Sequence, residues 1–401
     1  MDVGGNFCAA ANAFPSGVGA FRKAVSALLG LICVSACAPT LSVTQFDELP
    51  RDVARQPVLT VSGRAPTHDA TLFGRERAET LSYGVHTVSI PPDREPGRIR
   101  YPRGTPDPMR HFTFAFAETL SGQEVFLDML NRKLSQLDED ERILVIFVHG
   151  YNETFGSGLF RFAQMMHDFE IPGVPLYFAW PSAGDPRYYA YDLDSVFISR
   201  DGLADTLRLA SRAQADRIMI IAHSMGSMLT LEALRDLSDA NDGEVLSRIG
   251  QVALMSPDLS VDVFRSQLTV IGEASDIDFI VFTSTRDRAL RASAVLRGQT
   301  DRLGSLRSVE EVADLRLTVV DVSSFDTADP LRHSTVSMSP QLIALFAGTR
   351  DFGVEPAAQA GGVRGPLSLS VNVVRQATEI ILAPAAAAAG AIEGTGARQP
   401  N

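Results

Sequence analysis

A serine that stands between small residues at the end of an apolar run is the first candidate for chemistry in this chain. Residues 217–226 read RIMIIAHSMG, so a β-branched run leads directly into Ala222, Ser224 and Gly226. Small neighbours permit a turn tight enough to hold the serine strained above a sheet, although glycine is usual where Ala222 stands. We expect the Ser224 hydroxyl to attack a carbonyl carbon while the Met225 N–H binds the oxyanion. The alternative is a core serine that precedes a helix.

A nucleophilic serine needs a general base and a carboxylate that orients this base. His333 is the one histidine after Ser224, and it lies in a loop that follows an apolar run. An imidazole titrates near neutrality, so it can take the serine proton and return it. Asp258 and Asp287 each follow an apolar run between these two residues. Asp287 is favoured because the triad acid usually comes from the strand just before the strand that leads to the histidine. Asp287 could also cap the next helix.

An earlier apolar run is predicted to supply the second half of the oxyanion site. Residues 142–148 read RILVIFV and lead into His149, Gly150 and Tyr151. This pattern is typical of a central parallel strand and the loop after it. Because glycine lets the chain turn an amide toward a pocket, we expect the Tyr151 N–H to donate to the oxyanion. His149 is interpreted as a structural residue that hydrogen-bonds the loop.

The elements that must position these residues follow an alternating order. Strand and helix patterns alternate from residue 142 to 348, which is typical of crossover units around a parallel sheet. Residues 80–90 and 111–117 alternate apolar and polar positions and are expected to be antiparallel edge strands of the same sheet. A single domain is therefore predicted over residues 80–350.

Two regions flank this predicted domain. Residues 37–79 are predicted to be a linker. Residues 351–401 are rich in alanine and glycine, and we expect them to be a largely disordered tail. Within this tail, residues 367–382 are apolar enough to dock on the domain, and both helix and strand periods fit them.

Four short motifs together resemble a known family. They read FVHGYN at 147–152, FAWPS at 178–182, IAHSMG at 221–226 and TSTRDRAL at 283–290. In this combination the chain resembles a family of functionally uncharacterised bacterial α/β-hydrolases, often lipoproteins, over roughly residues 80–350. The resemblance implies the α/β-hydrolase fold, which is a doubly wound and mostly parallel sheet. It also implies a catalytic triad of Ser224, Asp287 and His333.

The stretch 181–191 holds three of the chain's seven tyrosines and follows an apolar run that ends in Trp180. Tyrosine rings offer contact area with a polar tip, so this loop is a candidate cover for an acyl or leaving-group pocket. The alternative is a loop held in place by aromatic packing. Trp180, the only tryptophan, is expected to lie in the core.

The N-terminus has the pattern of a lipoprotein signal peptide. A basic pair at 22–23 precedes the apolar run 24–34, and small residues lead into Cys37. The run is too short to span a bilayer, so residues 1–36 are predicted to be cleaved and Cys37 to be acylated. Because the leader is unusually long, we hypothesise that translation starts near Val18.

Composition restricts the classes of function. The three cysteines, Cys8, Cys33 and Cys37, lie in or beside the predicted signal peptide, so a cysteine nucleophile and a structural disulfide are excluded from the mature domain. No histidine or cysteine cluster has metal-ligand spacing, and no cofactor is expected. The net charge of −12, without a basic stripe, disfavours nucleic acid as a partner.

The sequence therefore predicts a serine hydrolase that cleaves carboxylic esters or thioesters, of small molecules or lipids, through an acyl-enzyme. Cys37 would anchor it to the cell envelope. An aspartate after the acylated cysteine signals retention in the inner membrane, and residue 38 is alanine. In a cell with two membranes, we therefore expect the protein to be attached to the outer membrane and to face the periplasm. A phospholipase would share this mechanism. The alternative from another class is a non-catalytic envelope lipoprotein that uses the hydrolase shell for binding.

Overall fold

A computed structural model describes residue 46 and residues 49–69, 72–102, 104–298, 301–348, 367–374 and 377–384. The predicted signal peptide, the start near Val18 and the acylation site Cys37 lie outside the described residues. In the part of the chain that is described, none of the helices has the length and apolar character needed to cross a membrane.

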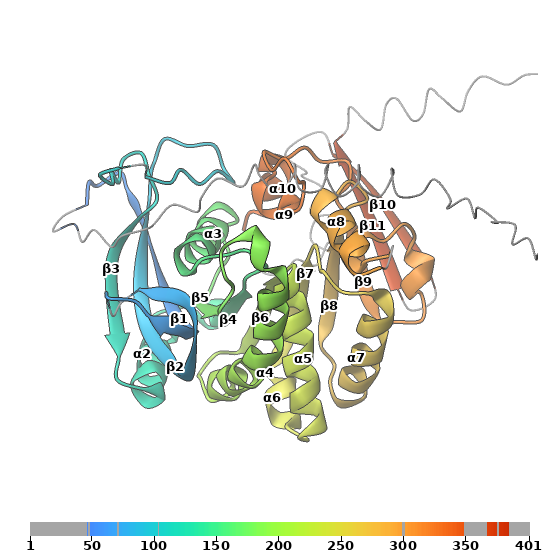
Figure 1. The fold of residues 1–401 in the computed structure, drawn as a ribbon, viewed down its shortest axis with the longest axis horizontal. Helices are drawn as coiled ribbons and strands as arrows, with labels where there is room; N and C mark the ends of the chain where they lie inside the picture. The colour runs from blue at the N-terminus through green and yellow to red at the C-terminus, as the bar shows by residue number, and fades with distance from the viewer. Residues whose placement is uncertain are drawn as a thin grey trace, which may run out of the picture. The chain divides into compact units, whose positions relative to one another are not determined.

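The described strands form one eleven-stranded sheet in the order β10-β11-β9-β8-β7-β6-β4-β5-β1-β2-β3 (Figure 1). Neighbouring strands from β11 to β1 along this order run parallel, and the pairs β1–β2, β2–β3 and β10–β11 are antiparallel. The strands are β1 (Ala54–Pro66), β2 (Phe73–Ile90), β3 (Thr113–Leu120), β4 (Ile143–Val148), β5 (Val174–Ala179), β6 (Arg217–His223), β7 (Ile249–Met255), β8 (Asp278–Thr283), β9 (Leu317–Asp321), β10 (Leu367–Val374) and β11 (Ala377–Pro384).

Helices cover both faces of this sheet, as a doubly wound fold requires. The described helices are α2 (Gln123–Leu134), α3 (Phe155–Asp168), α4 (Tyr189–Ser211), α5 (Met225–Asp239), α6 (Gly243–Ser247), α7 (Val261–Ala274), α8 (Arg288–Leu296), α9 (Thr335–Met338) and α10 (Pro340–Phe346). Side chains of α2, α4, α5 and α7 pack in one apolar cluster, and those of α3 and α10 pack in the other. Figure 1 shows α4, α5 and α7 on the near side of the sheet.

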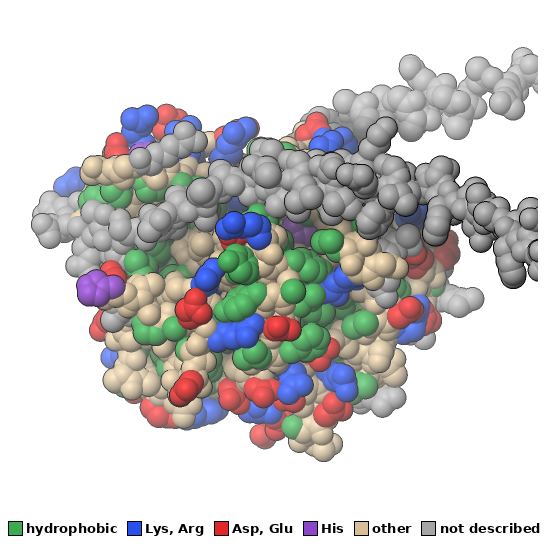
Figure 2. Space-filling model, viewed as in Figure 1, with side chains coloured by type: hydrophobic (Ala, Val, Ile, Leu, Met, Phe, Trp, Pro, Cys, Tyr) green, Lys and Arg blue, Asp and Glu red, His purple; other side chains and the backbone are tan. Residues whose placement is uncertain are grey.

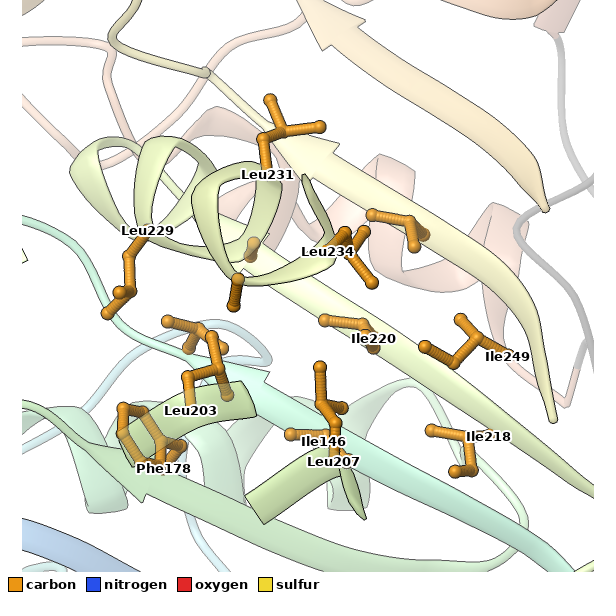
Figure 3. Packing of buried hydrophobic residues seen from close by; sticks show 14 of the residues in the cluster. Ile146, Phe178, Leu203, Leu207, Ile218, Ile220, Leu229, Leu231, Leu234 and Ile249 are labelled. Carbon is orange, nitrogen blue, oxygen red and sulfur yellow. The ribbon is translucent and has the colours of Figure 1, made fainter. Parts of the chain in front are cut away.

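The central strand β4 explains why both faces are covered. All six of its side chains are buried, and they alternate between the two apolar clusters. Strands buried on both faces are expected to be continuous apolar runs, which β4 and β5 are. Figure 3 shows the near side of this packing, where leucines of α4 and α5 contact Ile146 of β4 and Ile220 of β6.

The parallel core and the antiparallel edge strands β2 and β3 confirm the predicted fold class. The predicted start of the domain at residue 80 is wrong, because β1 lies within the stretch that was interpreted as a linker. β1 pairs in parallel with β5, from Leu59 opposite Leu176 to Ser62 opposite Ala179. On its other side it pairs with β2, so it connects the parallel core to the antiparallel edge. The proline of β1, Pro57, argues against a strand when only the sequence is known. In the structure Pro57 lies before Leu59, where the ladder with β5 begins.

The prediction of a largely disordered tail is also wrong for part of its length. Residues 367–374 and 377–384 form the hairpin β10–β11, and β11 pairs in parallel with β9. Alternating β-branched residues give this segment strand propensity, and pairing satisfies the backbone groups that an open β9 edge would leave exposed. The other residues of the predicted tail lie outside the described residues.

Candidate active site

The turn between β6 and α5 holds Ser224 in a conformation that few residues other than glycine adopt. Its φ is 53° and its ψ is −120°. The Ser224 N–H donates to the Met255 carbonyl at 3.0 Å, and the Ser224 carbonyl accepts from the Asp258 N–H at 3.2 Å. Within the described residues its hydroxyl makes no hydrogen bond. A strained backbone persists only where its surroundings impose it, so the turn presents a free hydroxyl at a fixed position.

Two glycines bring the loop after β4 against this turn. A Cβ on Gly150 would lie 3.0 Å from the Ser224 Cβ, and a Cβ on Gly226 would overlap the carbonyl oxygen of His149. Neither position has room for a side chain. Ala222, which replaces the usual first glycine, is fully buried, so its methyl group fits at the end of β6.

The structure brings His333 and Asp287 together. His333 Nδ1 lies 2.7 Å from Asp287 Oδ2, and the Asp287 side chain is fully buried. The other carboxylate oxygen of Asp287 accepts the Leu290 N–H at 2.9 Å, which caps α8. Asp287 therefore makes both of the contacts that its position suggested: it hydrogen-bonds the imidazole and it caps the helix.

The charge of Asp287 also sets the protonation of His333. Burial acts to lower the pKa of His333, but the negative charge of Asp287 and its hydrogen bond outweigh this effect. Asp258 and Asp329 add further negative charge, so the pKa of His333 is raised above its ordinary value of 6.5. A base of this kind is poised to accept a proton near neutral pH.

The His333 ring lies beside the turn that holds Ser224. Its centroid is 4.7 Å from that of His223, the residue before Ser224, and His223 Nε2 lies 3.3 Å from the His333 carbonyl oxygen. Burial and the charge of His333 lower the pKa of His223 to about 3, so His223 remains neutral. Among the described residues no hydrogen bond joins the Ser224 hydroxyl to His333. In free enzymes this contact is often long and tightens only when substrate binds.

The second candidate acid, Asp258, is bound elsewhere. Its Oδ1 lies 2.6 Å from Arg302 Nη2, and it also accepts the Ser293 hydroxyl at 2.7 Å. Both side chains of the Asp258–Arg302 pair are almost fully buried. Asp258 makes no hydrogen bond with His333 in the described structure, and it acts on that ring only through its charge. Geometry thus separates the two aspartates that the sequence left open.

The two predicted oxyanion donors come from the two elements that meet at Gly150. Met225 opens α5, and Tyr151 follows Gly150 in the loop after β4. Neither backbone N–H donates to an acceptor within the described residues. Two such amides on adjoining elements could receive the oxygen of a tetrahedral intermediate.

Two buried charges that the sequence did not single out hold the loop that contains Tyr151. The carboxylate of Asp192 on α4 accepts the Asn152 N–H at 3.1 Å and the Ser182 hydroxyl at 2.6 Å. Arg64 on β1 donates to the Glu153 carbonyl at 2.8 Å. Asn152 has a φ of 61°, so the loop turns sharply at the residue that Asp192 binds.

His149 also fixes this loop, as predicted. Its Nδ1 lies 2.9 Å from the Gly150 carbonyl oxygen, and its ring stacks on Trp180 with centroids 4.8 Å apart. Burial, followed by the charge of Arg64, lowers the pKa of His149 well below its ordinary value, so it is neutral. Trp180 is fully buried, which confirms its predicted place in the core.

The tyrosine-rich stretch packs beside the site. Tyr189, at the start of α4, contacts the Tyr151 ring edge to face at a centroid distance of 5.3 Å, and its hydroxyl lies 2.9 Å from the Ser293 hydroxyl. The Tyr151 hydroxyl donates to the Pro186 carbonyl. These contacts favour the interpretation in which aromatic packing holds this stretch. They also place its rings next to the loop after β4 that contains Tyr151, which we call the oxyanion loop because Tyr151 is a predicted oxyanion donor.

A small cavity of about 50 Å³ is lined by residues that include Gly150, Arg161, His223 and Ser334. This is space for water or a small polar group rather than an acyl chain. The described residues contain no group of three His, Cys, Asp or Glu side chains that could hold a metal ion.

Comparison with known families places this architecture. Residues 124–350 match the model of a family described as alpha/beta hydrolase of unknown function (DUF900), and the chain belongs to this family. The match and the doubly wound sheet confirm the predicted superfamily. A comparison with curated proteins finds no match.

Proposed function

We propose that this α/β-hydrolase is a serine hydrolase in which Ser224 is the nucleophile, His333 the general base and acid, and Asp287 the residue that orients the imidazole. The observation that carries the proposal is the 2.7 Å hydrogen bond between His333 and Asp287, beside a serine with a φ of 53°. A chain that only binds ligands has no need of a buried carboxylate behind an imidazole or of a strained serine.

The first half of the reaction forms an acyl-enzyme. His333 Nε2 takes the Ser224 proton as Oγ attacks the carbonyl carbon, and the carbonyl oxygen becomes an oxyanion held by the Met225 and Tyr151 N–H groups. The C–O or C–S bond to the leaving group then breaks, and the imidazolium gives its proton to that group. Asp287 stabilises the imidazolium through its charge.

The second half repeats these steps with water. His333 takes a proton from a water molecule as it attacks the acyl carbon, and returns it to Ser224 when the acid is released. None of these steps needs a cofactor. Carboxylic esters and thioesters are the proposed substrates, and attachment to the cell envelope through Cys37 is part of the proposal.

Hydrolysis of short-chain aryl esters tests the proposal. The parent protein should hydrolyse them, and Ser224→Ala should lower kcat by orders of magnitude while far-ultraviolet circular dichroism stays unchanged. Full activity in Ser224→Ala would refute the assignment. A folded parent protein that hydrolyses no ester or thioester of graded chain length would favour the non-catalytic alternative.

A further inference from the structure

Exposed apolar side chains lie on α8, which Asp287 caps, and in the loop before His333. Val295 and Leu296, at the end of α8, are 74% and 59% exposed, and Leu331 is 43% exposed. Three exposed arginines lie on the same elements. We call this group the α8 patch, and it consists of Arg286, Arg288, Arg291, Val295, Leu296 and Leu331.

The α8 patch joins α8 to the loop that carries His333. The Arg288 N–H donates to the Leu331 carbonyl at 2.8 Å, which joins the start of α8 to the loop before His333. Asp287 lies between two arginines of the patch, and His333 follows Leu331 by two residues. A ligand that binds Arg288 and Leu331 therefore lies near the loop that carries His333.

The positive charge of the patch is not neutralised within the described structure. Its three arginines have no ion pair there, and they donate to backbone carbonyls, such as that of Ser323 at 3.2 Å from Arg286 Nη1. Several other arginines are paired with acids, as Arg208 is with Asp242 at 2.8 Å. Figure 2 shows acidic and basic side chains intermixed over the lower part of one face. The chain has a net charge of −12, whereas the charged side chains of the patch are all arginines.

We propose that the α8 patch docks this protein on the surface of an anionic lipid bilayer. Arginine guanidinium groups bind lipid phosphates, and exposed valine and leucine side chains can enter the boundary between head groups and acyl chains. A nucleic acid would neutralise the arginines but leave Val295 and Leu296 in water. If the proposed function also holds, docking delivers acyl esters of membrane lipids to Ser224, and this last step alone depends on that function.

Vesicle sedimentation tests docking without catalysis. The full chain carrying Cys37→Ser and Ser224→Ala can be neither acylated at Cys37 nor active through Ser224. It should bind phosphatidylcholine vesicles more tightly when they contain phosphatidylglycerol, and salt should weaken this preference. Adding Arg288→Gln with Arg291→Gln should lower the partition constant roughly 25-fold, at about fivefold for each arginine.

Matched variants separate the patch from exposed apolar surface in general. Val295→Ser with Leu296→Ser should lower partitioning roughly tenfold. Phe197→Ser with Ile198→Ser, on α4, is the control, since these side chains are 54% and 55% exposed and lie outside the patch; it should leave partitioning unchanged. Three results would each overturn the proposal. The α4 control could lose as much partitioning as the patch variants, the protein could show no preference for anionic vesicles, or it could bind an oligonucleotide in place of vesicles. Labelling of the patch variants by a fluorophosphonate, with Ser224 restored, reports separately on the proposed function.

Discussion

Replacement of Asp287 by asparagine separates the orienting role of this residue from its structural one. One carboxylate oxygen accepts the Leu290 N–H at 2.9 Å and the other contacts His333 Nδ1 at 2.7 Å. In Asp287→Asn the carbonyl oxygen of the amide must face the Leu290 N–H, because that group is a donor. The amide NH₂ then faces His333 Nδ1 and makes it an acceptor, so Nε2 carries the hydrogen and cannot take the Ser224 proton.

The expected magnitude follows from this tautomer. The kcat should fall about 10⁴-fold, or roughly 5.5 kcal/mol of transition-state stabilisation. The cap on α8 is kept, so the free energy of unfolding should change by less than about 1 kcal/mol and Tm by less than about 4 °C. Without the charge of Asp287, burial dominates, and the pKa of His333 should fall below its ordinary value.

Steady-state kinetics on an aryl ester, with thermal unfolding as the check on folding, measures these effects. Asp258→Asn is the control, since Asp258 pairs with Arg302 and makes no hydrogen bond with His333 in the described structure. It should lower stability more than Asp287→Asn does and kcat far less. A kcat in Asp287→Asn within about tenfold of the parent value would refute the reasoning, as would a larger loss of kcat in a folded Asp258→Asn.

Four further results are expected. Gly226→Ala should lower the free energy of unfolding by about 1–3 kcal/mol or prevent folding, because the new Cβ overlaps backbone oxygens at the end of β4; thermal unfolding checks this, and an unchanged Tm would contradict it. Asp192→Asn should lower kcat about tenfold to a hundredfold with little change in KM, because an amide cannot accept all the hydrogen bonds that hold the oxyanion loop; kinetics that show a change in KM alone would count against it. The acidic limb of the pH profile of kcat/KM should lie above pH 6.5, since His333 must be neutral to act as a base and its pKa is raised. Activity should fall as the pH decreases through this pKa, and a limb well below pH 6.5 would contradict the prediction. Arg302→Met should cost about 3–5 kcal/mol in urea unfolding because it leaves the Asp258 carboxylate buried without its partner, and adding Asp258→Asn should recover part of that loss; equal stability in all three proteins would contradict this account.

The central part of the fold could be predicted from the sequence because the patterns that specify it are local. A continuous apolar run ending in small residues specifies both a buried parallel strand and the tight turn after it, so β4, β6 and the Ser224 turn were predictable. The order of serine, aspartate and histidine along the chain restricted the candidate residues to a few. It favoured Asp287 but left Asp258 as an alternative, because both follow strands, and the partners of each carboxylate distinguish them.

The parts that the sequence missed depend on contacts between distant residues. β1 contains a proline and lies far from β5 in sequence, and its place in the sheet comes from pairing with that strand. Residues 367–374 and 377–384 form a hairpin next to β9, although helix and strand periods both fit residues 367–382. Arg64 and Asp192 have no local motif, and their burial and their hydrogen bonds to the oxyanion loop emerge only in three dimensions. The one signal for Asp192 in the sequence was a charged residue directly after the tyrosine-rich stretch 181–191.

Covalent labelling with a fluorophosphonate, read by mass spectrometry, tests the central claim most directly. The account predicts one adduct, on the tryptic peptide 218–235 at Ser224, which forms more than about a hundredfold more slowly in His333→Ala and not at all in Ser224→Ala. An adduct on another residue, or a folded protein whose Ser224 reacts equally fast with and without the His333 imidazole, would contradict it.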